Sequence, residues 1–153
     1  MKSKLTYLLP LSILVIMAVG CIKKGTDPST DLSNYPYPLG TFNGRFLRIR
    51  FNPVTSKKDT TSVALQLILS TSIGYTVTGD TSTIHAGSYG SFSENNVNIA
   101  FNDFTYPANG RPTKTHLSGV YNYTLTGTAF QITGSDADST NISYVYNFTK
   151  VSN

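Results

Sequence analysis

Two histidines, a closely spaced pair of aspartates and many serines are among the residues of this chain whose types could bind a metal or catalyse hydrolysis. His85 and His116 lie far apart and lack the short spacing of zinc ligands, so only the fold could assemble a site from them. Asp136 and Asp138 could bind calcium, although a solvated loop gives the same spacing. A Ser-His-Asp hydrolase stays open without a Gly-x-Ser-x-Gly motif to support it. We expect no enzyme, no cofactor and no metal site.

Cys21 is the only cysteine, which excludes a disulfide and a cysteine-based metal site. It follows Lys2, Lys4 and the apolar run Leu5–Val19, whose length suits a secretory signal of about 7–15 apolar residues better than a membrane span of roughly 20. The segment Ala18-Val19-Gly20-Cys21 resembles the bacterial lipobox. An uncleaved anchor helix and an ordinary secretory signal are the alternatives.

The lipobox resemblance implies that residues 1–20 are a lipoprotein signal peptide and that a diacylglyceryl group is attached to Cys21. Two or three acyl chains, at about 0.8 kcal/mol per buried methylene, make such attachment practically permanent. The membrane is then a partner through this lipid. We expect a lipid-anchored protein of the outer membrane, on its periplasmic face or at the cell surface.

Removal of residues 1–20 lowers the formal charge from +4 to +2, so the working protein is only weakly basic. Arg45, Arg48 and Arg50 form the one basic cluster, within an alternating apolar segment. A solvated strand face explains this cluster, with an anion or nucleic-acid site as the alternative. We expect no nucleic-acid partner.

Residues 21–39 read as a flexible tether, because proline, glycine and polar residues interrupt any apolar periodicity. The alternative is that Tyr35 and Tyr37 pack back on the following domain as a lid. Residues 40–153 are expected to form that domain.

After Gly40 the apolar residues alternate with polar ones, as in half-buried strands. Val97, Ile99 and Phe101 are the clearest case. In the first strand Phe42 and Phe46 share one parity and Leu47 the other, which indicates a bulge or two covered faces. Eight strands are expected, around 40–51, 63–69, 73–78, 85–93, 97–102, 121–125, 130–132 and 142–148.

Eight strands in meander order can close into an antiparallel barrel. The segments Gly40–Gly44, Leu117–Tyr123 and Tyr146–Lys150 resemble the lipocalin-like domains of Bacteroidota lipoproteins. This resemblance implies an all-β, eight-stranded, lipocalin-like meander barrel. A β-sandwich is the alternative, and pairing of the first strand with the last would favour the barrel.

Tyrosines on the inward parity of the strands are the only positive sign of a binding site, since their hydroxyl groups need partners when buried. Plain packing is the alternative explanation for each of them. The barrel is expected to bind or carry a small hydrophobic or amphipathic ligand. A second hypothesis is a solid adhesion or accessory barrel whose loops, such as Pro107–Pro112, contact glycan or protein. The candidate wall residues are Tyr121, Tyr123, Tyr144, Tyr146 and Phe101.

Overall fold

The structure, a computed structural model, describes residues 37–108 and 112–153. The predicted signal peptide, Cys21 and the tether up to residue 36 lie outside the described residues. The described part of the chain contains no helix that is long and apolar enough to cross a membrane. Its strands are β1 (Gly40–Asn52), β2 (Lys57–Ser70), β3 (Gly74–Gly79), β4 (Ser88–Asn95), β5 (Asn98–Asp103), β6 (Gly119–Thr126), β7 (Ala129–Asp136) and β8 (Ser139–Ser152).

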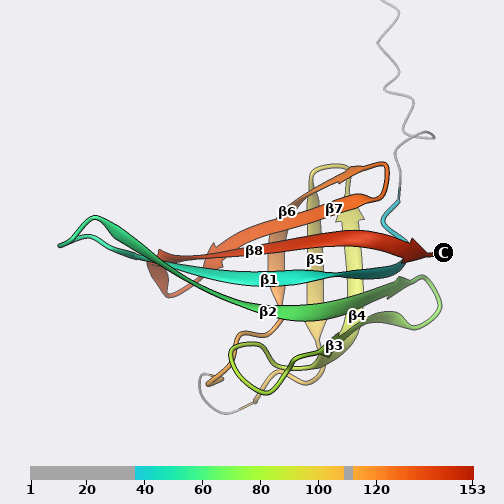
Figure 1. Cartoon of the computed structure of the whole chain (residues 1–153). Helices are drawn as coiled ribbons and strands as arrows, with labels where there is room; N and C mark the ends of the chain where they lie inside the picture. Colours follow the sequence, from blue (N-terminus) through green and yellow to red (C-terminus); the bar gives the residue numbers. More distant parts are fainter. Residues whose placement is uncertain (1–36, 109–111) are drawn as a thin grey trace, which may run out of the picture. The chain divides into compact units, whose positions relative to one another are not determined.

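The eight strands form one antiparallel meander that closes on itself (Figure 1). Each strand pairs with the next along the chain, and β8 returns to pair with β1, from Thr41 opposite Ser152 to Arg50 opposite Ile142. This pairing confirms the predicted closed barrel and shows that the β-sandwich alternative is wrong. Closure leaves the sheet no free edge.

The alternation along each strand decides which side chains enter the barrel. In β2, Val63, Leu65, Leu67 and Leu69 are all buried, and the residues between them are half-buried or exposed. One strand face therefore supplies the core, and the other faces outward.

β1 carries apolar residues on both faces without a bulge between them. Phe42 and Phe46 are fully buried inside the barrel, whereas Leu47 and Ile49 lie half-buried on the outer face. The register against β8 is continuous beyond Phe42, and its one irregularity lies between Thr41 and Phe42. Of the two expectations, the bulge is therefore wrong for this part of β1.

Large aromatic and aliphatic side chains fill the barrel interior. The Phe46 ring lies 4.8 Å from the Tyr146 ring, and the Phe42 ring lies 4.9 Å from the Phe130 ring, measured between centroids. Leu67, which is fully buried, belongs to the same cluster. The described interior is thus a packed core, as in small barrels whose inward side chains meet.

The two ends of the barrel differ. The connections β2–β3, β4–β5 and β6–β7 lie at one end, where β1 also begins and β8 also ends. There Pro38 is buried, and the Tyr37 ring lies 6.3 Å from the Phe92 ring. The connections β1–β2, β3–β4, β5–β6 and β7–β8 lie at the opposite end, which we call the mouth.

Two long loops fold into the mouth. Residues 80–87 join β3 to β4, the described residues 104–108 and 112–118 belong to the β5–β6 connection, and His85 forms a parallel bridge with Thr115. The expected strand 85–93 is therefore too long, because β4 begins at Ser88 and the residues before it turn inward. His85 and Leu117 are both fully buried, so these loops complete the core at the mouth.

Candidate functional site

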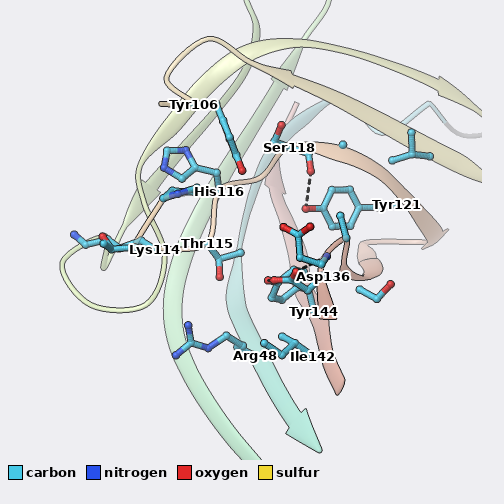
Figure 2. Close-up of a pocket in the computed structure, with 17 residues that line it drawn as sticks. Arg48, Tyr106, Lys114, Thr115, His116, Ser118, Tyr121, Asp136, Ile142 and Tyr144 are labelled. Atoms are coloured by element: carbon cyan, nitrogen blue, oxygen red, sulfur yellow. Dashed lines mark hydrogen bonds between the residues drawn. The ribbon is translucent and has the colours of Figure 1, made fainter. Parts of the chain in front are cut away.

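A partly open pocket of about 400 Å³ lies at the mouth (Figure 2). Its walls come from β1, from the β5–β6 loop with the start of β6, and from the β7–β8 turn with the start of β8. In Figure 2 the labelled basic residues Arg48 and Lys114, with His116 beside Lys114, lie to one side of Tyr121, Asp136 and Tyr144. The pocket therefore combines charged groups with aromatic surface, as ligand sites often do.

Tyr144 brings a hydroxyl group to the pocket wall. Its hydroxyl donates a hydrogen bond of 2.5 Å to Asp136 Oδ2, and Asp136 Oδ1 accepts a second bond of 2.8 Å from the Asp138 amide. Burial, and then the Asp136 carboxylate, raise the pKa of Tyr144 well above its usual value. Tyr144 is therefore a neutral donor, and Asp136 is a carboxylate whose oxygens are already engaged.

Tyr121 brings a second hydroxyl to the same pocket from β6. This hydroxyl donates to the Ser118 carbonyl oxygen at 3.0 Å, which is the dashed bond in Figure 2. Burial raises the pKa of Tyr121 to about 12, so this residue also stays neutral. Its ring lies over Gly134 of β7, where a Cβ atom would come within 2.5 Å of Tyr121 Cδ1. Only glycine leaves room for the ring here.

The β5–β6 loop supplies a histidine in fixed orientation. His116 Nδ1 lies 2.7 Å from Asp103 Oδ2, and the Asp103 side chain is fully buried. Asp103 Oδ1 accepts two further bonds, from the Thr105 amide at 2.7 Å and the Thr105 hydroxyl at 2.6 Å. The Tyr106 ring packs edge-on against the His116 ring, with 5.3 Å between centroids. Asp103 thus fixes the imidazole at the pocket wall.

Arg48 reaches the pocket from β1, whereas Arg45 and Arg50, the other two arginines of the basic cluster, do not line it. It pairs with Tyr144 of β8 and Thr61 of β2, and it shares the inward face of β1 with Phe46. Arg45 is exposed and donates to the Ser62 hydroxyl at 2.7 Å. The predicted solvated strand face thus describes Arg45, whereas Arg48 is half-buried in the pocket.

The structure divides the five candidate wall residues between pocket and core. Tyr121 and Tyr144 line the pocket, and Tyr121 is at the same time a buried member of the core. Tyr146 and Phe101 lie in the core, and Tyr123 is buried with its hydroxyl 2.8 Å from Glu94 Oε2. The tyrosines of one inward face are therefore separated along the barrel axis.

The Tyr146 hydroxyl meets the second histidine inside the core. His85 Nδ1 donates to the Ala86 carbonyl oxygen at 2.6 Å, because that oxygen can only accept. His85 Nε2 therefore accepts the bond of 3.0 Å from the Tyr146 hydroxyl. Burial is the main cause that lowers the pKa of His85 from 6.5 to about 4. His85 is consequently neutral at pH 7.

Arg48, Asp136 and His116 line the pocket, although none of them is among the candidate wall residues of the ligand site. The sequence does indicate that Arg48 faces inward, since it lies two residues after Phe46 and therefore on the same strand face. The other two depend on long-range pairing, which includes a register irregularity between Ser135 and Asp136.

No group of three or more histidine, cysteine, aspartate or glutamate side chains among residues 37–108 and 112–153 is arranged to hold a metal ion. Comparisons with protein-family models, with curated proteins and with solved structures gave no match. The proposal of a function therefore rests on the geometry of the pocket.

Proposed function

We propose that this protein is a lipid-anchored lipoprotein of the bacterial outer membrane, of the lipocalin-like kind found in Bacteroidota, which binds a small amphipathic molecule at the mouth of its barrel. The observation that carries the proposal is the pocket of about 400 Å³. Its volume lies within the range of about 300–1,000 Å³ that is usual for small-molecule sites.

The packed interior favours a binding site at the mouth over one on the barrel axis. A molecule inside the barrel would have to displace side chains such as Phe46 and Tyr146, both fully buried. Truncating one such aromatic residue costs about 3–5 kcal/mol of stability, so the core is an unfavourable place for a ligand. At the mouth, Tyr121 and Tyr144 offer aromatic surface beside charged groups.

Retention of small molecules tests the binding proposal. The full chain, purified in a non-ionic detergent, is incubated with an extract of bacterial envelope and washed, and the retained molecules are identified by mass spectrometry. The variant Tyr144→Phe removes a hydroxyl from the pocket, and we expect it to retain at least several-fold less of the same molecule. Tyr89→Phe is the matched control, because Tyr89 is exposed on β4, outside the pocket.

Two results would contradict the binding proposal. One is that the wild type retains no small molecule in repeated experiments. The other is that Tyr144→Phe and Tyr89→Phe behave alike. If a pull-down from intact envelope instead recovers a glycan or protein through the mouth loops, the adhesion hypothesis replaces the proposal.

Metabolic labelling with an alkyne fatty acid tests the anchor separately. We expect the wild type to carry the label and to sediment with membranes, and Cys21→Ala to lose the label. An unlabelled wild type, or a labelled Cys21→Ala variant, would contradict lipid attachment at Cys21.

A further inference from the structure

We infer that the pocket selects a ligand with an oxyanion, such as a carboxylate or phosphate group, and that the Arg48 guanidinium binds this group. The inference rests on the proposed function, because it assumes that the pocket at the mouth is the binding site. It adds the charge of the ligand and the residue that recognises it.

The carboxylates around the pocket already have partners. Asp136 accepts bonds from the Tyr144 hydroxyl and the Asp138 amide. The buried Asp103 side chain accepts from Thr105 and contacts His116. Donors within the protein therefore engage the oxygens of both carboxylates, and Asp138, which also lines the pocket, has an interaction partner as well.

Arg48, unlike these carboxylates, has a charged group that no protein group binds in the described structure. No hydrogen bond or ion pair joins its guanidinium to any residue within 37–108 or 112–153. Its neighbours across the ladder are Thr61 on β2 and Tyr144 on β8, and neither carries a charge that could neutralise it. Arg50, the next residue on the same face, lies instead opposite Asp59. Arg48 is thus a half-buried cation without a protein counter-ion in the described structure.

A guanidinium offers two parallel N–H groups that match the two oxygens of a carboxylate or phosphate. Such a group in the pocket would supply the counter-ion that Arg48 lacks. The Lys114 ammonium, which donates to the Thr81 carbonyl oxygen at 2.8 Å, lines the same pocket and adds positive potential. Both positive charges would repel a cationic group placed beside Arg48.

The rest of the pocket suits an apolar or aromatic body attached to this anion. Ile142 lies opposite Arg50, next along β8 from Tyr144 on the inward face. Tyr121 and Tyr106 also line the pocket, away from Ile142 in Figure 2. The combination predicts a small aromatic or aliphatic acid, or its phosphate counterpart, as the ligand class.

Titration with matched fragments tests the inference. Benzoate and phenyl phosphate are the anionic probes, and benzamide is the neutral probe of the same shape as benzoate. Binding to the full chain in a non-ionic detergent is followed by ligand-observed NMR. We expect benzoate or phenyl phosphate to bind at least tenfold more tightly than benzamide, and comparison of the two anions shows which group the site prefers.

Three variants assign the effect to Arg48. Arg48→Gln should weaken anion binding by about 10- to 100-fold, the usual range for losing charge-assisted hydrogen bonds. Arg48→Lys keeps the charge without the paired N–H groups and should give an intermediate loss. Arg50→Gln makes the same charge change two residues away, outside the pocket lining, and should stay within about twofold of wild type. Thermal unfolding of each variant verifies that the barrel remains folded.

The outcomes separate this inference from the proposed function. If benzamide binds as tightly as benzoate, or if Arg48→Gln and Arg50→Gln weaken binding equally, the inference is overturned although the pocket still binds ligands. Failure of both anions to bind also overturns the inference. The proposed function fails only when, in addition, the wild type retains nothing from the envelope extract.

Discussion

Mild acid is expected to destabilise the barrel through His85. The folded chain holds this imidazole neutral against Tyr146, where burial lowers the pKa of His85 to about 4 from the usual 6.5. His116 lowers that pKa further, while the Ala86 carbonyl and Asp103 oppose the shift. A proton on Nε2 would place a second donor against the Tyr146 hydroxyl, which now donates to that atom. The unfolded chain has no such conflict.

The sign and size of this change in the unfolding free energy follow from the linkage between protonation and folding. The unfolded state takes up its proton near pH 6.5 and the folded state near pH 4, so the contribution of His85 is complete above pH 6.5 and falls as the pH drops toward 4. The loss is about 1.4 kcal/mol per pH unit within this window. Between pH 7.5 and pH 5 it reaches about 2 kcal/mol, which lowers the urea midpoint by about 1 M for a barrel of this size.

Urea unfolding followed by circular dichroism, at half-unit steps from pH 7.5 to pH 4.5, measures this loss. His85→Gln keeps a donor and an acceptor but cannot titrate, so its pH dependence should be flatter than that of wild type by about 2 kcal/mol over the window. His116→Gln separates the contribution of the other histidine. If wild type and His85→Gln lose stability in parallel, the reasoning is refuted. An NMR titration that gives His85 a pKa near 6.5 in the folded protein would refute it as well.

Three further substitutions test the packing. Gly134→Ala should lower the unfolding free energy by about 1–3 kcal/mol in urea titrations, because its Cβ would collide with the Tyr121 ring; an unchanged midpoint would contradict this close contact. Tyr75→Phe should cost about 1–2 kcal/mol in the same assay, because it removes the 2.7 Å bond to the buried Leu117 carbonyl; a neutral effect would show that this bond is dispensable. Val54→Lys should stay within about 0.5 kcal/mol, since Val54 is 92% exposed in the β1–β2 turn; a larger loss would indicate a contact that the exposure does not predict.

The barrel follows from the sequence because its strands alternate so regularly. Runs such as Val63 to Leu69 present one apolar face each, and short polar turns between successive runs favour pairing of neighbours. Closure of the barrel needs one further pairing, between β1 and β8. This pairing places Phe46 opposite Tyr146, so that two apolar inward faces meet. Local pattern and global topology agree for all eight strands, except that β4 begins at Ser88 and not at His85.

The site depends on contacts that alternation cannot predict. His85 reads as part of a strand, yet the loop before Ser88 turns inward and buries this side chain against Phe46 and Tyr146. Strand periodicity predicts that Tyr144 and Tyr146 face inward, but it does not say which of them meets the mouth and which meets the core. That difference comes from the two inward loops, whose course is set by long-range hydrogen bonds such as the one from Lys114 to Thr81.

The position of the chain ends has a practical consequence for access. β1 begins beside the end of β8, at the end of the barrel opposite the pocket. Immobilisation through an affinity tag at Asn153 would therefore attach the barrel by the end away from its ligand, so a sensor surface would not obstruct the mouth. Under the proposed lipid attachment, the chain would enter the barrel at this end, so a ligand could enter and leave the pocket without release of the anchor.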